Sequence, residues 1–366
     1  MKIFRTGAYE TFYDFPLVIG WDITMRCNYR CSYCFDKGGV QNKISSRKPF
    51  STLTQLKAAV NNIASLNRPW YEINFSGGEP TLHPHLVDLI VMLHEKLEER
   101  LNKVLIITNG SRNMAFYKKI ADIKNLINIT MQISIHTEQV DMAHILELIE
   151  TLSKDINIRL ALMFNPVKRE EVHLIYDILF EYRKIFPFSM NINLLRDSGL
   201  LVSRYTKEDF EWQREATLKF NALENVLQSK IPAPKKLPRS MRIFYDAEQN
   251  GERKIIESAN RAVNLTNGLL KFTGMYCIAN SSLLYIQEDE NCHGMVCPAD
   301  LFIFNIYEED AITTFRNEMI HGIKCPMPLC DCSANDHIPK FSSYEEAVQF
   351  IRVIREKQEN LSKQTK

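Results

Sequence analysis

The chain has 366 residues, of which 45% are hydrophobic and 24% charged, which is enough for one large domain or two unequal domains with a substantial core. Lys and Arg total 45 against 44 Asp and Glu, and this net charge of +1 gives no global attraction to nucleic acid or anionic lipid. Without an apolar run of membrane-spanning length or a signal-peptide core, we expect a cytoplasmic protein with no membrane or nucleic-acid partner.

Residues 17 to about 197 alternate short apolar runs with segments of helical periodicity, which is typical of strand-helix units on a parallel sheet. Six strands are predicted, at Leu17–Thr24, Tyr71–Ser76, Val104–Thr108, Ile129–Ile135, Ile158–Phe164 and Met190–Leu195. Helices between them are predicted from apolar residues three or four positions apart, within 52–63, 86–97, 113–123, 145–152 and 172–182. Six units make an α/β partial barrel rather than the closed form of eight, and ligands are expected at the C-terminal ends of the strands.

The loop after the first predicted strand carries three cysteines, Cys27, Cys31 and Cys34. A disulfide framework uses an even number of cysteines, and a closed zinc site uses four ligands. Three thiolates can instead hold three corners of a 4Fe-4S cluster, whose fourth iron stays open to a ligand that is not protein. The alternatives are a three-cysteine zinc site completed by a distant ligand, and unrelated buried thiols.

The segment CNYRCSYC resembles the Cys-x3-Cys-x2-Cys signature of the radical S-adenosylmethionine (SAM) enzymes, including an aromatic residue, Tyr33, before the last cysteine. The resemblance implies a partial (β/α)6 barrel, a 4Fe-4S cluster on Cys27, Cys31 and Cys34, SAM at the open iron, and a cofactor contact for Tyr33. In such enzymes the reduced cluster cleaves SAM to a 5′-deoxyadenosyl radical that abstracts hydrogen. Because no dinucleotide or nucleoside triphosphate motif occurs, an external electron donor of the flavodoxin or ferredoxin type is expected.

The second predicted strand ends in Gly77-Gly78-Glu79, where the glycines allow a ligand close to the backbone and Glu79 offers a carboxylate to a cation. A glycine pair after a strand is usually only a turn. This one resembles the GGE motif of the family, which implies that it binds the amino group of SAM. By the same resemblance Asn109 and Ser134, near the ends of the third and fourth strands, are candidates for the SAM ribose and carboxylate. Each could also be a turn residue.

Three more polar residues follow strands at the same edge of the predicted sheet. His136 stands where many peptide-modifying relatives have Asp, and Asn165 and Asp197 follow the fifth and sixth strands. Asn165 and Asp197 are candidates for substrate contact. His136 and Asp197 are also candidate catalytic residues.

A further helix is predicted at 206–229, before the proline-rich stretch IPAPKKLP at 231–238, which stiffens the chain into an extended connection. We therefore predict an N-terminal extension (1–16), the barrel (17–200), a helix and linker (201–240), a small cysteine-rich α+β domain (241–340) and a C-terminal helix (341–366). Within the cysteine-rich domain, strands at Leu269–Phe272 and Ser282–Ile286 are predicted to form a hairpin that brackets Cys277.

The six remaining cysteines all lie in this last region: Cys277, Cys292, Cys297, Cys325, Cys330 and Cys332. Clustered thiols in a cytosolic protein are more often metal ligands than disulfides. Four thiolates can hold an auxiliary 4Fe-4S cluster or a structural zinc ion. The region resembles a twitch domain or a reduced SPASM domain, which implies one auxiliary cluster. We expect Cys277, Cys297, Cys325 and either Cys330 or Cys332 as its ligands, with Cys292 free.

The sequence thus predicts an anaerobic radical SAM enzyme of the oxidoreductase type, whose auxiliary cluster assists oxidation of the substrate radical or binds substrate. Only 16 residues precede the first predicted strand, too few for a precursor-recognition domain, so a small metabolite such as a sugar or amino-alcohol is the expected substrate. The first alternative is a peptide maturase that crosslinks or epimerises its substrate, in which Cys292 is a candidate hydrogen donor. The second is a non-catalytic iron-sulfur or zinc sensor or scaffold, against which the GGE segment argues.

Overall fold

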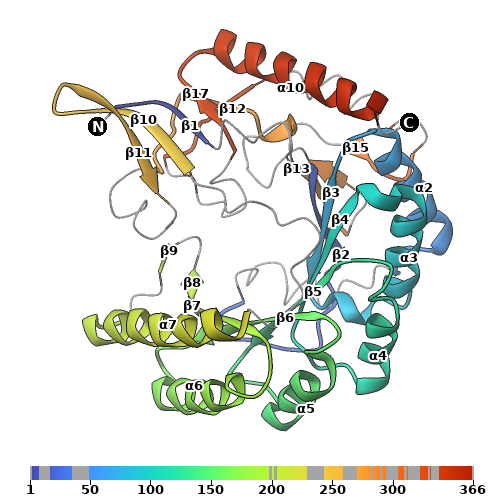
Figure 1. Cartoon of the computed structure of the whole chain (residues 1–366), viewed down its shortest axis with the longest axis vertical. Helices are drawn as coiled ribbons and strands as arrows, with labels where there is room; N and C mark the ends of the chain where they lie inside the picture. The colour runs from blue at the N-terminus through green and yellow to red at the C-terminus, as the bar shows by residue number, and fades with distance from the viewer. Residues whose placement is uncertain are drawn as a thin grey trace.

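The computed structural model describes residues 2–7, 17–34, 49–197, 200–201, 204–228, 243–258, 270–281, 283–288, 291–293, 304–308, 311, 322–328, 330 and 338–364. Most strands belong to two sheets, which lie side by side in Figure 1. The larger sheet has nine strands in the order β15-β14-β13-β2-β3-β4-β5-β6-β7. The proline-rich linker predicted at 231–238 lies outside the described residues.

Six consecutive parallel strands make up the main part of the larger sheet, as the sequence predicts. They are β2 (Leu17–Thr24), β3 (Tyr71–Gly77), β4 (Leu101–Thr108), β5 (Ile129–Ile135), β6 (Asn157–Phe164) and β7 (Ser189–Leu194). Their connections contain α2 (Leu53–Ser65), α3 (Leu86–Leu97), α4 (Met114–Asp122), α5 (Met142–Leu152) and α6 (Arg169–Arg183), and α7 (Lys207–Gln228) follows β7. Figure 1 shows these helices along the outer side of the curved sheet, so the prediction of an α/β partial barrel is confirmed.

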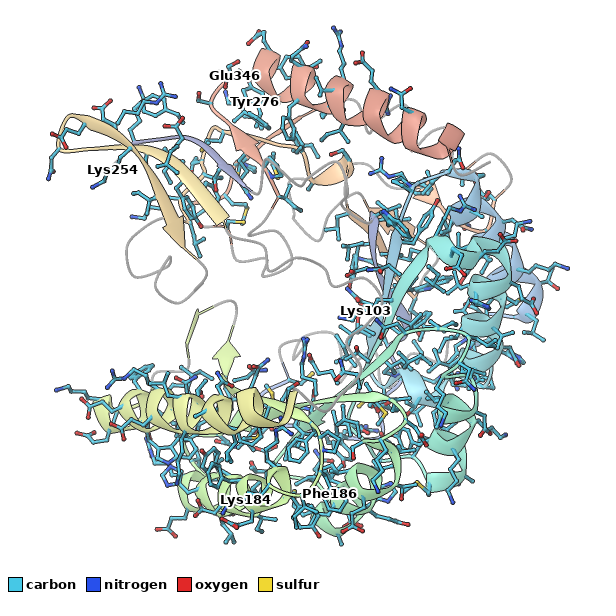
Figure 2. All side chains as sticks on the ribbon, viewed as in Figure 1. Lys103, Lys184, Phe186, Lys254, Tyr276 and Glu346 are labelled. Carbon is cyan, nitrogen blue, oxygen red and sulfur yellow. The ribbon has the colours of Figure 1, made fainter. Side chains whose placement is uncertain are left out.

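The core of this unit lies between the sheet and its helices, where side chains fill the space in Figure 2. Along β2 and β3 every second residue is buried, which brings Trp21 and Phe75 into the core. Helix α2 begins at a capping box, in which the Gln55 N–H donates to Thr52 Oγ1 and the Thr52 N–H donates to Gln55 Oε1. Burial of each large apolar side chain stabilises the fold by about 1.5–3 kcal/mol.

The smaller sheet combines strands from both ends of the chain, in the order β11-β10-β1-β17-β12-β16. Its members are β1 (Lys2–Gly7), β10 (Ile243–Gln249), β11 (Glu252–Ser258), β12 (Tyr276–Cys277), β16 (Ile323–Lys324) and β17 (Lys340–Phe341). The predicted C-terminal helix, α10 (Tyr344–Gln364), begins after Ser343, whose Oγ accepts the Glu346 N–H at 3.1 Å. Its Ala347, Ile351 and Ile354 pack against Phe341.

The predicted hairpin around Cys277 is wrong. Leu270 and Phe272 are buried in an apolar cluster but form no strand, so their burial reflects packing and not a ladder of hydrogen bonds. The second predicted strand is present as β13 (Leu283–Ile286), but it pairs in parallel with β2. A short helix, η4 (Ala279–Ser281), connects Cys277 to it.

Two short strands extend the larger sheet beyond β13, namely β14 (Asn291–His293) and β15 (Phe304–Asn305). The two sheets therefore do not follow the linear division of the chain, because β1 joins the smaller sheet and β13 to β15 join the larger one. A separate hairpin pairs β8 (Arg196–Asp197) with β9 (Leu200–Leu201). None of the helices in the described ranges has the length and apolar character needed to cross a membrane.

Candidate active site

The loop after β2 carries Cys27, Cys31 and Cys34 at the C-terminal edge of the parallel strands. All three thiols are free and half-buried. The Cys34 N–H donates to Cys31 O at 3.1 Å, so the loop closes into a turn between these two residues. The pKa of the Cys31 thiol is raised to about 12, mainly by burial and in addition by the nearby charges of Cys27, Glu138 and Cys34. The three thiols are thus close enough to influence one another electrostatically.

Several N–H groups point at the sulfur atoms of this loop. The Tyr29 N–H donates to Cys27 Sγ at 3.4 Å, Asn109 Nδ2 lies 4.0 Å from the same sulfur, and Gln139 Nε2 lies 3.8 Å from Cys31 Sγ. Such donors stabilise thiolate sulfur and tune iron-sulfur clusters. The donor set therefore fits a three-thiolate cluster. Within the described ranges, no three His, Cys, Asp or Glu side chains form a site for a single metal ion.

Two side chains from the turn after β5 hold the backbone of the cysteine loop. Glu138 Oε2 accepts the Ser32 N–H at 2.7 Å, and Glu138 Oε1 accepts the Ser32 hydroxyl. Gln139 Oε1 accepts the Arg30 N–H at 2.9 Å. The sequence reasoning missed Glu138 and Gln139, because their partners are set by the tertiary fold. The sequence offers one general indication: the backbone N–H groups of a three-cysteine loop need hydrogen-bond acceptors from other parts of the chain.

The glycine pair after β3 supports the same loop from the other side. The Gly78 N–H donates to Thr24 O and the Glu79 N–H to Arg26 O, both at 2.8 Å. Gly77 has a φ of +119°, and a Cβ there would lie 2.3 Å from Thr24 O. The glycines thus allow the end of β3 to lie directly against the backbone that leads into Cys27.

The Glu79 carboxylate has a different role from the one predicted. We expected it to be offered to a cation, but it is only 1% exposed and faces inward. Its oxygens accept from the Thr81 N–H at 3.0 Å, the Thr81 hydroxyl at 2.5 Å, the Thr108 hydroxyl at 2.7 Å and the Asn109 N–H at 2.6 Å. Burial raises the pKa of Glu79, and these hydrogen bonds oppose that shift. Glu79 therefore connects the ends of β3 and β4.

The two candidates at the third and fourth strand ends differ in how freely they could meet a ligand. Asn109 is buried, and its amide donates to Asn28 Oδ1 at 2.9 Å while it accepts the Ser111 N–H at 3.0 Å. Ser134 is half-buried on β5, and within the described part of the chain its hydroxyl has no hydrogen-bond partner. Of the two side chains, Ser134 is therefore the one whose polar group is available to bind a ligand.

Tyr33 and His136 form a pair beside the thiols. The Tyr33 hydroxyl and His136 Nδ1 are 3.0 Å apart, and the two rings stack with centroids 5.8 Å apart. Burial lowers the pKa of His136 to about 4, so its ring is neutral at pH 7. Asn165 donates to Glu138 Oε1 at 3.3 Å, which brings it to the same turn. For Asp197 the structure describes only the backbone, in β8.

The sequence reasoning also missed the carboxylate of Asp22, which lies within the larger sheet. Asp22 lies on β2, where it accepts from the Ser76 hydroxyl of β3 at 2.6 Å and from the Tyr285 hydroxyl of β13. The same face continues to Thr24, whose hydroxyl donates to Glu288 Oε1 at 3.4 Å. A charged residue within a buried strand is the signal that could have identified Asp22.

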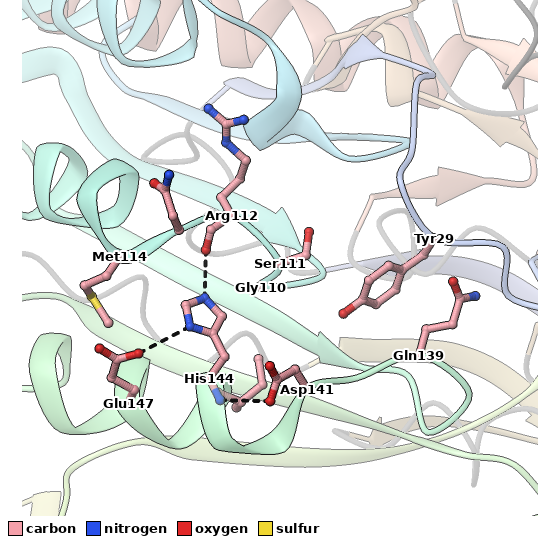
Figure 3. A pocket seen from close by; sticks show the side chains of 11 residues that line it. Tyr29, Gly110, Ser111, Arg112, Met114, Gln139, Asp141, His144 and Glu147 are labelled. Atoms are coloured by element: carbon pink, nitrogen blue, oxygen red, sulfur yellow. Dashed lines mark hydrogen bonds and ion pairs between the residues drawn. The ribbon is translucent and has the colours of Figure 1, made fainter.

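A pocket of about 540 Å³ lies next to the cysteine loop, between the connections that follow β4 and β5 (Figure 3). Tyr29 lines it from the loop, Arg112 from one connection and Asp141 from the other. His144 closes one side, since its Nε2 lies 2.7 Å from Arg112 O and its N–H donates to Asp141 Oδ1 at 3.2 Å. The lining includes neither the thiols nor the glycine pair.

Three of the predicted auxiliary thiols lie on or next to the smaller sheet, close enough for Cys325 and Cys330 to influence the charge of Cys277. Cys325 and Cys330 pack against a buried cluster of Tyr245, Leu270, Phe272 and Met275. Burial raises the pKa of Cys277 to about 11, while the Lys340 charge lowers it and the charges of Cys330 and Cys325 raise it. Cys297 and Cys332 lie outside the described residues, and only the backbone of Cys292 is described, in β14.

Comparison with known proteins gives a consistent result. Residues 21–163 match the Radical SAM superfamily. An S-adenosylmethionine-dependent nucleotide dehydratase from Psychrobacter lutiphocae is 34% identical over 113 residues, which are 29% of this chain and only 37% of that protein. Native anSMEcpe with bound AdoMet has a TM-score of 0.53 at 14% identity, over 96% of this chain and 100% of that one. Streptococcus suis SuiB bound to the precursor peptide SuiA has a TM-score of 0.51 at 13% identity, over 83% and 66%. At these identities the two structures share the fold alone.

Proposed function

Because this chain has an α/β radical SAM fold with a radical SAM domain at residues 21–163, we propose that it is a radical SAM enzyme of the oxidoreductase type. Cys27, Cys31 and Cys34 would hold its 4Fe-4S cluster. The observation that carries the proposal is the cysteine loop itself. Its three thiols are free, and side chains or backbone from the ends of β3, β4 and β5 hold it in place.

When reduced and bound to SAM, the cluster would supply a 5′-deoxyadenosyl radical that takes hydrogen from the substrate, with the electron coming from a flavodoxin-type or ferredoxin-type donor. The chain's own residues would fix the loop and orient the cofactor. Glu138 and Gln139 fix the backbone of Ser32 and Arg30, so the thiols keep their positions when ligands exchange. Because the side chains of Glu138 and Gln139 bind the loop through its backbone, they fix its position without occupying the sulfur atoms, which stay available to iron.

SAM would bind over the strand ends beside this loop. We assign the Gly77–Gly78 backbone to its amino group, as the motif implies, because the glycines leave no side chain between ligand and backbone. Ser134 has a hydroxyl that can donate to the SAM carboxylate or ribose. Asn109 would act mainly through Cys27 and Asn28, and Tyr33 would pack beside the cofactor on the His136 ring.

The thiols of the smaller sheet would bind one auxiliary 4Fe-4S cluster. The predicted ligands are Cys277, Cys297 and Cys325 with either Cys330 or Cys332 as the fourth, and of these Cys277, Cys325 and Cys330 are among the described residues. A structural zinc ion on the same thiolates is the alternative, and it would have no redox role. Metal analysis separates the two.

For the substrate we propose a small metabolite. The similarity over 113 residues to a nucleotide dehydratase supports a small molecule, whether a nucleotide or the sugar or amino-alcohol expected from the sequence. The second candidate is a peptide. It is supported by folds shared with SuiB bound to SuiA, and with anSMEcpe bound to AdoMet and the Kp18Cys peptide at a TM-score of 0.51.

Anaerobic reconstitution tests the proposal. Iron, zinc and sulfide are counted per chain, and 5′-deoxyadenosine is measured after dithionite reduction with SAM. The parent enzyme should hold about eight irons, and the Cys27→Ala, Cys31→Ala, Cys34→Ala triple variant about four with no 5′-deoxyadenosine. Cys292→Ala is the matched control, and its iron content and SAM cleavage should equal those of the parent. Zinc in place of iron on Cys27, Cys31 and Cys34, or no cleavage by a reduced cluster, would refute the enzyme and favour a sensor or scaffold.

The substrate class is tested by stimulation of SAM cleavage and by deuterium transfer into 5′-deoxyadenosine. Perdeuterated nucleotides and sugars form one set of probes, and synthetic peptides with deuterated Cα positions form the other. Transfer from the first set supports the small metabolite. Transfer from the second set alone would overturn it in favour of the peptide, and Cys292→Ala would then show whether that thiol returns a hydrogen during epimerisation.

A further inference from the structure

A buried lysine lies next to the thiols of the smaller sheet. Lys340 is only 2% exposed, and its ammonium donates to Ile338 O at 2.8 Å. Strands β12 and β17 are antiparallel, and their register places Cys277 directly opposite Lys340. The position is marked in Figure 2 by Tyr276, the residue before Cys277. Residues opposite one another on adjacent strands share a face, with Cβ atoms about 5 Å apart. The ammonium therefore belongs to the surroundings of the Cys277 thiol.

The same ammonium also lies over an aromatic ring that belongs to the apolar cluster beside the other two thiols. Lys340 Nζ lies 4.7 Å from the centroid of the Phe272 ring. Phe272 is buried in the apolar cluster against which Cys325 and Cys330 pack. Lys340 thus lies beside Cys277 and also beside the apolar cluster against which Cys325 and Cys330 pack.

Burial of this charge has an energetic consequence. An ammonium taken out of water loses several kcal/mol of hydration unless charges or hydrogen bonds replace it. Neutral thiols replace little of that hydration, whereas thiolates that bind a metal cluster carry negative charge. A cation at this position is therefore favourable when the three thiols hold an anionic group.

We propose that Lys340 is the counter-charge of an anionic metal-thiolate site on Cys277, Cys325 and Cys330, and that it raises the reduction potential of the auxiliary cluster there. The inference rests on the proposed function, because the cluster on these thiols is part of that proposal. One-electron reduction by an external donor makes the cluster more negative. A buried positive charge stabilises the reduced form more than the oxidised form, so its removal lowers the potential.

The test uses the full-length chain carrying Cys27→Ala, Cys31→Ala and Cys34→Ala, so that only the auxiliary cluster contributes to the spectra. Redox titration followed by electron paramagnetic resonance gives the reduction potential in this background and with Lys340→Gln, Lys340→Met or Lys340→Arg added. Lys340→Gln keeps a hydrogen-bond donor and removes the charge, while Lys340→Arg keeps the charge. Lys254→Met, on exposed edge strand β11 of the same sheet (Figure 2), is the matched control because water and salt screen that charge.

We expect Lys340→Gln and Lys340→Met to shift the equilibrium between reduced and oxidised cluster by about tenfold or more, which is about 59 mV for one electron. Lys340→Arg and Lys254→Met should keep the background potential. An iron-loaded cluster whose potential is the same with Lys340→Gln would overturn the inference and leave the auxiliary cluster standing. A chain that binds no iron at this site would overturn the proposed cluster, and the inference with it.

Discussion

Substitution of Gly78 by alanine tests how the end of β3 holds the cysteine loop. A Cβ at Gly78 would lie 2.4 Å from the carbonyl oxygens of both Met25 and Arg26, and 2.6 Å from the Met25 carbonyl carbon. Ordinary contacts to a Cβ begin at 3.4 Å, so the structure is about 1 Å short of the space required. All these atoms are backbone, so no side chain can rotate away. Because Arg26 directly precedes Cys27, the displacement passes into the loop of thiols.

The expected magnitude follows from that displacement. Misplacing reacting groups by about 1 Å costs about 100-fold in rate, so Gly78→Ala should cleave SAM about 100 times more slowly than the parent. The control is Gly251→Ala, in the turn between β10 and β11, where φ is +83° and nothing lies within 4 Å of a new Cβ. The left-handed backbone there costs an alanine about 1 kcal/mol of stability, with no effect on cleavage.

The assay is formation of 5′-deoxyadenosine with dithionite as reductant, together with iron per chain and far-ultraviolet circular dichroism. The spectrum should be that of the parent in both variants, since only the loop must move. A Gly78→Ala enzyme with the parental rate and iron content would refute the reasoning. So would equal losses in Gly78→Ala and Gly251→Ala, because the effect would then belong to glycine replacement in general.

Three further substitutions test two residues of the site, Glu138 and Glu79, and the buried ring of His83. Glu138→Gln leaves only one oxygen to accept both the Ser32 N–H and the Ser32 hydroxyl. A hydrogen bond to a charged group contributes about 1.5–3 kcal/mol, so SAM cleavage should fall at least tenfold. An unchanged rate would show that the contact between Glu138 and Ser32 is dispensable. Glu79→Gln places an amide donor against the Asn109 N–H and should lower the free energy of unfolding in urea by about 2 kcal/mol or more, and no loss would contradict the connecting role. Burial lowers the pKa of His83 to about 4, so the folded state favours the neutral ring. The free energy of unfolding should therefore fall by about 3 kcal/mol as the pH drops from about 6.5, the pKa of His in the unfolded chain, to about 4, its pKa in the folded chain. Urea titrations at pH 7 and pH 4.5 should show a smaller loss in His83→Leu, and equal losses would argue against this origin.

The barrel could be predicted from the sequence because its strands are short apolar runs in which buried residues recur regularly. Leu17–Thr24 and Ile129–Ile135 have the predicted bounds, and the other four strands differ by a few residues at their ends. Continuous apolar runs separated by helical stripes leave few alternatives to parallel strand-helix units. The capping box at Thr52 and the N-cap at Ser343 are local signals, which the fold did not override.

The strands of the C-terminal region could not be predicted in the same way. Leu283–Ile286 pairs with β2, whose sequence lies at the other end of the chain, and nothing local selects that partner. Leu270 and Phe272 have the alternation of a strand, yet they are buried by packing against Tyr245 and Met275. Short apolar runs of this kind do not separate a strand from a packed loop.

In the candidate site, the sequence points to residues with distinctive chemistry and gives no sign of those that hold the cysteine loop through hydrogen bonds. Cysteines at the right spacing and a glycine pair after a strand carry their own signal. Glu138 and Gln139 are ordinary turn residues in sequence, and their partners on the cysteine loop follow from the adjacency of β5 to the other strand ends. Glu79 carries the signal of a ligand, but burial makes it a structural acceptor.

The two groups of thiols lie at opposite ends of the parallel strands, and this bears on the substrate. Cys27 follows the C-terminal end of β2, whereas Cys277 packs with Leu283 and Val18 at the N-terminal ends of β13 and β2. From Val18 to Thr24, β2 advances about 20 Å at about 3.3 Å per residue. With the proposed clusters at these two places, a sugar or nucleotide base beside the first would lie away from the second, which would then act as an electron acceptor at a distance. An extended peptide of about six residues spans the same interval, so the peptide candidate could contact both proposed sites at once.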